Sequence, residues 1–502
     1  MADRRDGDPA GRGRVVEAPA GAPEPAGPAG PATVPGGSSA ATALRRDEGA
    51  QLPAAAEPPG DARAWGVVVV LMLIYVNSFL DRSILSLLVD PIRDSLQISE
   101  SQMGFLMGPA FAVFYIVAGI PLGRLADLVA RKWLVFWGQL AWSVMSVGCG
   151  LVRSFAPFAA LRMGLGVGEA SLSPAAYSMI TDLFPRHKLA RALSVYGLGI
   201  SIGAGLARIL GGVVIRFTEE VDSIVLPVLQ REVFSWQLVF FLVAAPTIPL
   251  SIALILMREP PRRSARAAVA GAAPVQAASA TLGETLRYVW ANRATMACHS
   301  FGMALLSFSG YGVGAWLPSH FVRNLGWSRA QVGVVLGVVM VITGVGGMLF
   351  GGWLADRMHQ RGVRNGKMRI ALLSCVAWFP FGIVYPLLDD PWLVMAVYAP
   401  AAFIGAMPWG IGPAVVQEIM PNRMRGQASA IYLFVINLLG LGFGPQILAL
   451  CTQYVFGGAT GVRWSLLAVP VAAHALSAVL LLLGLKHYVR SLDRLAARRA
   501  AG

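Results

Sequence analysis

The stretch Gly123-Arg124-Leu125-Ala126-Asp127 recurs in this chain, with one change, as Gly352-Trp353-Leu354-Ala355-Asp356, and Arg357 follows the second copy. A second pair of similar stretches, Asp182-Leu183-Phe184-Pro185 and Glu418-Ile419-Met420-Pro421, has nearly the same separation, and basic residues follow both copies. Each of the four stretches comes near the end of a long apolar run. Matching motifs in matching loops indicate a duplicated unit, and internal repeats of this kind are typical of transporters.

The composition is that of a membrane protein. Of the 502 residues, 56% are hydrophobic and 14% are charged, whereas a soluble domain has about 25% charged residues. A bilayer span needs roughly 20 predominantly apolar residues. We therefore predict an all-α membrane protein with twelve transmembrane helices in two pseudo-symmetric six-helix halves. The predicted spans are 65–89, 102–123, 133–152, 155–180, 190–216, 236–257, 294–317, 330–353, 369–387, 392–416, 428–450 and 464–486.

The regions around the spans complete the domain organisation. Residues 1–60 are rich in Pro, Ala and Gly and are predicted to form a disordered cytoplasmic tail. They also lack the apolar core of a cleavable signal peptide. The two six-helix halves are residues 61–257 and 294–487. Between them, 258–293 is predicted to be a cytoplasmic linker that contains a short amphipathic helix, and 488–502 a basic cytoplasmic tail.

The net charge of +14 follows the predicted topology. Basic residues gather in alternate loops, and the intervening loops carry acids such as Glu219 and Asp389. This positive-inside pattern places both termini in the cytoplasm and argues against a nucleic-acid partner. We expect a monomeric multi-pass protein of the cell inner membrane, whose partners are the lipid bilayer, protons and a small amphipathic or anionic substrate. The basic loop residues include Arg124, Arg131, Lys132, Arg186, Lys188, Arg191, Arg258, Arg262, Arg263, Arg357, Arg361, Arg423 and Arg425.

The charged residues that stand out inside predicted spans are Asp81 and Arg82 in the first span and Arg162 and Glu169 in the fourth. A charge in hydrocarbon costs at least a few kcal/mol, so such residues usually face a cavity and handle protons, ions or substrate. At about 1.5 Å of rise per residue, Asp81, Arg82 and Arg162 fall at similar depth in the outer half, and Glu169 lies two turns from Arg162 on the same helix face. We predict that the acids carry protons and that the arginines pair with them or hold an anionic substrate. The alternative is a fixed ion pair that only holds two helices in register.

Arg208 lies late in the fifth predicted span. As a second cation facing a cavity it would favour an anionic substrate. Equally, its long side chain could extend to the periplasmic head groups. Both interpretations stay open on the sequence.

Several stretches resemble a known family. The loop at Gly123, with Arg131 and Lys132 after it, resembles the signature loop of the major facilitator superfamily. Within that superfamily the chain is most similar to the spinster-like transporters, including bacterial members, over about residues 65–450. The stretches that carry this likeness are Leu80-Asp81-Arg82, Pro91-Ile92-Arg93, Gly164 to Ser171, and Asp182-Leu183-Phe184. The resemblance implies the major facilitator fold, with a substrate site between the halves near the bilayer midplane.

The resemblance also implies two further groups of residues. One is a cytoplasmic gate that favours the outward-facing state, for which the alternative is topology set by positive charge alone. The other is a possible cavity lining in the second half, for which the alternative is core packing or aromatic belts at the membrane interfaces. The gate residues are Asp127, Arg131, Asp356 and Arg357, and the lining residues are Tyr311, Trp316, Trp409 and Asn437.

Enzymatic and cofactor functions find little support in the sequence. The four cysteines show no CxxC spacing and the histidines form no cluster, so no metal site is expected. Gly199-Ile200-Ser201-Ile202-Gly203 fits a nucleophile motif but lies in a predicted span, not in a strand-to-helix turn. No phosphate-binding Gly-x-x-x-x-Gly-Lys motif supports ATP drive. We therefore predict a protein that is not an enzyme and needs no cofactor.

The combined prediction is a secondary active transporter, coupled to protons and working by alternating access. The favoured substrate, as the resemblance implies, is an amphipathic or lipid-like organic anion of the lysophospholipid or sphingolipid class. The alternative is a proton symporter for a sugar acid or another small organic anion.

Overall fold

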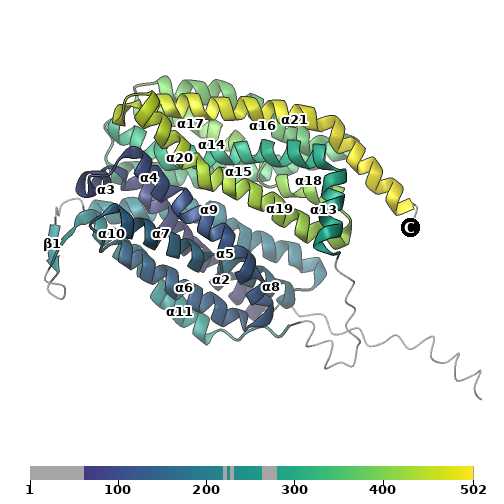
Figure 1. Cartoon of the computed structure of the whole chain (residues 1–502), viewed down its shortest axis with the longest axis horizontal. Helices are drawn as coiled ribbons and strands as arrows, with labels where there is room; N and C mark the ends of the chain where they lie inside the picture. The colour runs from purple at the N-terminus through teal and green to yellow at the C-terminus, as the bar shows by residue number, and fades with distance from the viewer. Residues whose placement is uncertain (1–60, 219–222, 227–230, 263–279, 501–502) are drawn as a thin grey trace, which may run out of the picture. The chain divides into compact units, whose positions relative to one another are not determined.

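The computed structural model describes four parts of the chain: 61–218, 223–226, 231–262 and 280–500. The predicted N-terminal tail and the linker residues 263–279 lie outside the described residues. Every one of the predicted spans contains helix. Figure 1 shows the helices of the first sequence half packed together and those of the second half packed together.

The first half contains broken and continuous helices, and an antiparallel hairpin of β1 (Ser223–Leu226) and β2 (Arg231–Phe234) pairs Ser223 with Phe234. The helical elements are α2 (Ala62–Ser83), η2 (Ile84–Leu87), α3 (Val89–Leu96), α4 (Glu100–Met107), α5 (Pro109–Leu128), α6 (Arg131–Cys149), α7 (Phe155–Glu169), α8 (Leu172–Leu183), α9 (Arg186–Thr218), α10 (Ser235–Ala244) and α11 (Thr247–Leu256).

The second half follows a short helix, α13 (Leu282–Ala291). Its helical elements are α14 (Arg293–Arg323), α15 (Arg329–Gln360), α16 (Gly366–Val384), η3 (Tyr385–Leu387), α17 (Pro391–Ala406), α18 (Gly412–Ile419), η4 (Asn422–Met424), α19 (Arg425–Asn437), η5 (Leu438–Phe443), α20 (Gly444–Leu450), η6 (Cys451–Val455), η7 (Ala459–Gly461) and α21 (Val462–Ala500).

The spans differ in how regular they are. In the described part of the chain, eight helical stretches are long and apolar enough to cross a bilayer by themselves. The other predicted spans are occupied by shorter or less apolar helices, such as the pair α7 and α8. Proline and glycine explain several interruptions: Pro109 starts α5 directly after Gly108, and Pro445 follows the π-helical turn η5.

The duplication seen in the sequence is visible in the ion pairs. Arg131 at the start of α6 pairs with Asp182 of α8, and Lys367 at the start of α16 pairs with Glu418 of α18. The partners in each half are separated by 51 residues. Tyr488 of α21 also donates to Glu418. Equivalent ion pairs therefore connect equivalent helices in the two halves, at one end of the bundle.

We call that end the motif face, because it carries the loops after α5, α8, α15 and α18. The other end, with the β1–β2 hairpin and the loops after α3 and α14, is called the opposite face. Small residues bring the halves together toward the opposite face. A Cβ at Gly108 would lie 2.5 Å from the carbonyl oxygen of Gly442, and one at Gly212 would lie 2.7 Å from that of Ala330. A Cβ at Gly119, which lies nearer the motif face, would meet no atom within 4 Å.

Candidate transport site

The predicted intramembrane charges come together in the first half. They are placed by α2, which carries Asp81 and Arg82 in its last turn, and by α7, which carries Arg162 and Glu169. Asp81, Arg162 and Glu169 are almost completely buried. Because burial of charge is expensive, the geometry of each pairing decides what the cluster can do.

Glu169 and Arg82 form an ion pair. The Nε and Nη2 atoms of Arg82 lie 2.6 Å and 2.5 Å from Glu169 Oε2. The hydroxyl of Ser78 donates to the same oxygen at 2.8 Å. The Glu169 side chain is 0% exposed, whereas the Arg82 side chain is 13% exposed. Arg82 is therefore the member of the pair that solvent or substrate reaches first.

Each buried carboxylate keeps one unused oxygen. Asp81 Oδ1 accepts a hydrogen bond from the hydroxyl of Ser146 on α6. Among the described residues, Asp81 Oδ2 and Glu169 Oε1 are buried and have no hydrogen-bond donor. A buried oxygen without a donor is costly for the ionised form. Protonation of either carboxyl would reduce that cost.

Arg162 is held by carbonyl oxygens, not by a carboxylate. Its Nε donates to Leu106 and its Nη1 to the backbone of Asp81, both at 3.3 Å. The ring of Phe111 lies near both guanidiniums, 4.6 Å from that of Arg82 and 5.5 Å from that of Arg162. The two arginines thus share one aromatic ring, an arrangement that offsets part of the cost of burying charge.

The close approach of α5 and α7 makes that arrangement possible. A Cβ at Gly166 would lie 2.5 Å from the carbonyl oxygen of Phe111. Only glycine therefore fits at this contact.

Arg208 lies apart from the carboxylates. Its Nη1 donates to Ala204 in its own helix at 3.1 Å, and its Nη2 donates to Gly314 of α14 at 3.0 Å. The residue is 7% exposed, so its side chain does not extend to the surface. No acidic residue in the described part of the chain forms an ion pair with it. Arg208 is a buried cation that links the two halves through a carbonyl oxygen.

The second-half residues predicted from the resemblance have two environments. Tyr311, Trp409 and Asn437 are partly exposed. Trp316 is fully buried, and its Nε1 donates to the carbonyl oxygen of Pro445 at 2.8 Å. In this conformation Trp316 packs between α14 and α20.

The predicted gate residues are also divided. Asp127, Asp356 and Arg357 are exposed, and no ion pair joins them among the residues that the structure describes. Arg131 is buried and bonds to Asp182, to the backbone carbonyl oxygen of Pro260 and, more distantly, to Glu259. Arg131 thus connects helices within the first half. Among the described residues, no ion pair of the predicted gate residues joins the two halves in this conformation.

In the part of the chain that the structure describes, the ion pairs that join the halves lie at the opposite face, and no sequence motif pointed to them. Arg323 of α14 contacts Asp90 at 2.7 Å and Glu100 at 2.9 Å. Arg93 of α3 contacts Glu100 at 2.7 Å. The side chains of Glu100 and Arg323 are only 3% and 7% exposed. This set of four residues, the opposite-face network, has balanced charge and seals the seam between the halves.

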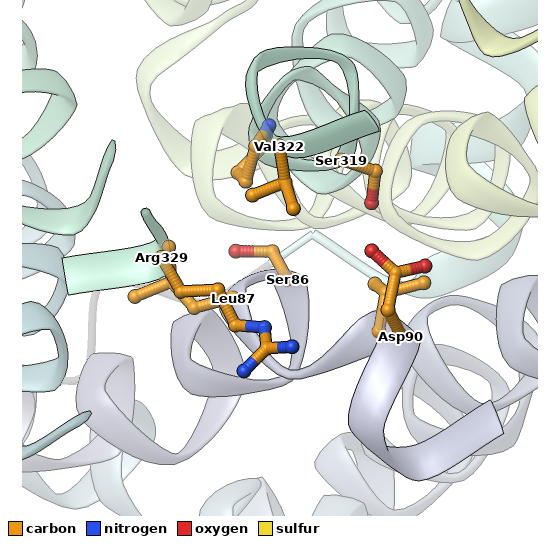
Figure 2. Close-up of a pocket in the computed structure, with 8 residues that line it drawn as sticks. Ser86, Leu87, Asp90, Ser319, Val322 and Arg329 are labelled. Atoms are coloured by element: carbon orange, nitrogen blue, oxygen red, sulfur yellow. The ribbon is translucent and has the colours of Figure 1, made fainter. Parts of the chain in front are cut away.

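A narrow pocket lies beside this network. Figure 2 shows hydroxyl groups of Ser86 and Ser319 and the carboxylate of Asp90 around it. Because Asp90 belongs to both features, opening of the seam would disturb the pocket and the network together. The labelled lining residues are Ser86, Leu87, Asp90, Ser319, Val322 and Arg329.

No group of three metal-binding side chains occurs in the part of the chain that the structure describes. Buried charge between apolar helices, in two halves that are sealed at one end, defines a membrane-embedded secondary transporter. The chain belongs to the Major Facilitator Superfamily, whose family model matches residues 71–445.

Comparison with known proteins agrees with this class. The chain is 26% identical to an MFS-type efflux pump of Mycolicibacterium smegmatis, over 87% of this chain and 96% of that protein. It is 24% identical to a hexuronate transporter of Bacillus subtilis, over 76% of this chain and 86% of that protein. A solved bacterial homologue of the human lysosomal transporter spinster, inward-facing and unoccupied, is 25% identical with a TM-score of 0.74, covering 86% of this chain and 98% of that one. The predicted likeness to spinster-like transporters is therefore confirmed.

Proposed function

We propose that this transporter couples the movement of an amphipathic organic anion to protons. In this proposal the motif face is cytoplasmic, in keeping with the basic loops on it, and both termini lie in the cytoplasm. The protein acts as a monomer in the cell inner membrane. The conformation described above is then open toward the cytoplasm and closed toward the outside by the opposite-face network.

The observation that carries the proposal is the buried ion pair between Arg82 and Glu169. A substrate anion that binds the partly exposed guanidinium competes with Glu169 for it. A buried carboxylate that loses its partner is destabilised by several kcal/mol unless it takes up a proton. Substrate binding and protonation of Glu169 would therefore favour each other.

Asp81 is the second proposed proton carrier. It lies next to Arg82 in the chain and keeps one oxygen without a donor. If both carboxylates are ionised, they balance the charges of Arg82 and Arg162. A bound anion upsets that balance, and one proton on Asp81 or Glu169 restores it.

The surroundings of Arg82 favour an amphipathic substrate. Its guanidinium lies 4.6 Å from the ring of Phe111, 4.8 Å from that of Tyr115 and 5.2 Å from that of Phe79. Aromatic rings beside a cation suit an anionic head group attached to an apolar chain, as in lysophospholipids or sphingolipids. A sugar acid is the second candidate, because the likeness to the hexuronate transporter covers most of both chains.

Transport in proteoliposomes tests the proposal. Lysophospholipid, sphingoid phosphate and hexuronate fluxes would be measured with and without a pH gradient, for the native protein and for Glu169→Gln and Asp81→Asn. We expect flux of a lipid-like anion that the gradient accelerates, and loss of this acceleration in both variants. Gradient-driven flux that persists in Glu169→Gln would show that the pair is only a fixed structural link. Gradient-driven hexuronate flux without lipid flux would establish the second candidate.

A further inference from the structure

The helix α13 carries an apolar stripe that no other part of the described chain covers. Leu282, Leu286 and Trp290 are 59%, 48% and 70% exposed. Their spacing of four places them on one helix face. The side chains that hold α13 to the bundle point elsewhere: Thr285 is fully buried, and Tyr288 donates to the carbonyl oxygen of Ile419 at 3.2 Å. At about 100° per residue, the stripe lies roughly a third of a turn from the buried face, so it points sideways.

The helix lies across the ends of the spanning helices. Figure 1 shows α13 beside α18 and α19, crossing their direction. Its start is fixed by a capping box, in which Thr281 Oγ1 accepts from the Glu284 amide at 3.2 Å and Glu284 Oε2 accepts from the Thr281 amide at 3.1 Å. A helix in this orientation runs parallel to the membrane plane at the motif face.

The stripe continues into an exposed stripe of α14. The guanidinium of Arg293 lies 5.4 Å from the ring of Trp290. From Arg293, the exposed positions of α14 continue through Ala297 to Phe301, again four residues apart. The exposed side of α14 therefore runs into the exposed stripe of α13, with Arg293 at the junction.

Basic residues lie beside α13 and the start of α14 on the neighbouring helix, α21. Along α21, exposed Val479 and Leu483 are followed on the same side by exposed Lys486 and Arg490. Two contacts align α21 with α13 and the start of α14: the hydroxyls of Thr295 and Ser491 are 2.8 Å apart, and Arg494 Nη1 donates to the carbonyl oxygen of Ala291 at 2.5 Å. The change from apolar to basic side chains marks the boundary between hydrocarbon and head groups.

We propose that this surface is a docking site for anionic phospholipid. Leu282, Leu286 and Trp290 enter the outer part of the acyl region, and Arg293, Lys486 and Arg490 bind the negatively charged head groups. The linker-helix surface, defined by these six residues, attaches the connection between the halves to the leaflet. Lipid is favoured over a protein partner because the stripe is narrow, lateral and continuous with the exposed stripe of α14, which contains a predicted span.

Spin labels on the full-length protein test this proposal. Cys298 and Cys451, which are partly exposed, would be replaced by serine, and a nitroxide attached at Trp290→Cys or, as the matched control, at Arg287→Cys. Accessibility to oxygen and to a water-soluble nickel complex would be measured in vesicles of phosphatidylcholine alone or mixed with phosphatidylglycerol. We expect the label at 290 to be accessible to oxygen and protected from nickel in the mixed vesicles, and the label at 287 to show the reverse. Replacement of Lys486 and Arg490 by glutamine removes two cations and should reduce the preference of the surface for anionic lipid roughly 30-fold.

Three outcomes would overturn the proposal. They are equal nickel access at 290 and 287, insertion at 290 that is indifferent to lipid charge, and protection of 290 from both reagents, which would indicate a protein contact. None of these measurements depends on transport, so the result is independent of the proposed substrate and proton coupling.

Discussion

The opposite-face network offers the sharpest test of how the halves move. Replacement of Arg323 by glutamine removes the contacts to Asp90 at 2.7 Å and to Glu100 at 2.9 Å. The loss of one partner from a buried pair costs about 3–5 kcal/mol. Here Glu100 keeps Arg93 and the Asp90 side chain is 22% exposed. We therefore expect the lower end of that range, about 3 kcal/mol.

That cost applies only while the seam is closed, because the acids become hydrated when the halves separate. The population of the closed conformation should then fall roughly 150-fold relative to the open one. Nitroxides at two exposed positions of the opposite face, Asp94→Cys in the first half and Thr460→Cys in the second, report the separation by electron–electron distance measurement. We expect a longer distance in Arg323→Gln than in the native background.

The matched control is Arg463→Gln. Arg463 contacts Asp389 at 2.5 Å, but both residues belong to the second half and the Asp389 side chain is 85% exposed. This variant should leave the distance unchanged, since exposed pairs contribute little. A distance between the labels that stays unchanged in Arg323→Gln, or that lengthens equally in both variants, would refute the sealing role of the network. The double variant Arg323→Gln with Glu100→Gln should recover part of the closed population, because Asp90 and Arg93 then remain and the charge of the network is balanced again.

Three further variants test packing and hydrogen bonds by thermal unfolding in detergent. Ser146→Ala removes the donor to Asp81 and should cost about 1–3 kcal/mol; an unchanged midpoint would mean that Asp81 is not ionised there. Gly166→Ala places a methyl group 2.5 Å from the Phe111 carbonyl oxygen and should cost about 1–3 kcal/mol, and stability equal to the native protein would contradict the close approach. Tyr488→Phe removes one of two donors to Glu418 and should cost about 1 kcal/mol, with no loss expected if Lys367 alone satisfies that carboxylate.

The helical architecture and the charged cluster were predictable from the sequence for physical reasons. Long apolar runs must be helical in a bilayer, because every backbone group needs a partner within the segment. Asp81 and Glu169 stood out because charge is rare in such runs. Their hydrogen-bond partners Ser78 and Ser146 did not stand out, because serine is common where helices pack and gives no signal in the sequence.

Which acid pairs with which arginine was not predictable. Arg162 and Glu169 share a helix, yet Glu169 pairs with Arg82 on another helix, because the approach of α2 and α7 depends on packing that no spacing reveals. Arg323 lies near a loop, where basic residues usually reflect topology. Its role as a seal emerges only when Asp90 and Glu100 are brought beside it from the other half.

The duplication allows the residues of the buried charged cluster to be compared with their equivalents in the second half. When the repeats are aligned on Gly123 and Gly352, Tyr311 occupies the position of Arg82. When they are aligned on Asp182 and Glu418, Gly405 occupies the position of Glu169. The second half therefore holds uncharged residues, one tyrosine and one glycine, at the positions of Arg82 and Glu169. The two halves thus differ at the buried charged cluster, and their common ancestry is kept in the ion pairs Arg131–Asp182 and Lys367–Glu418 at the motif face.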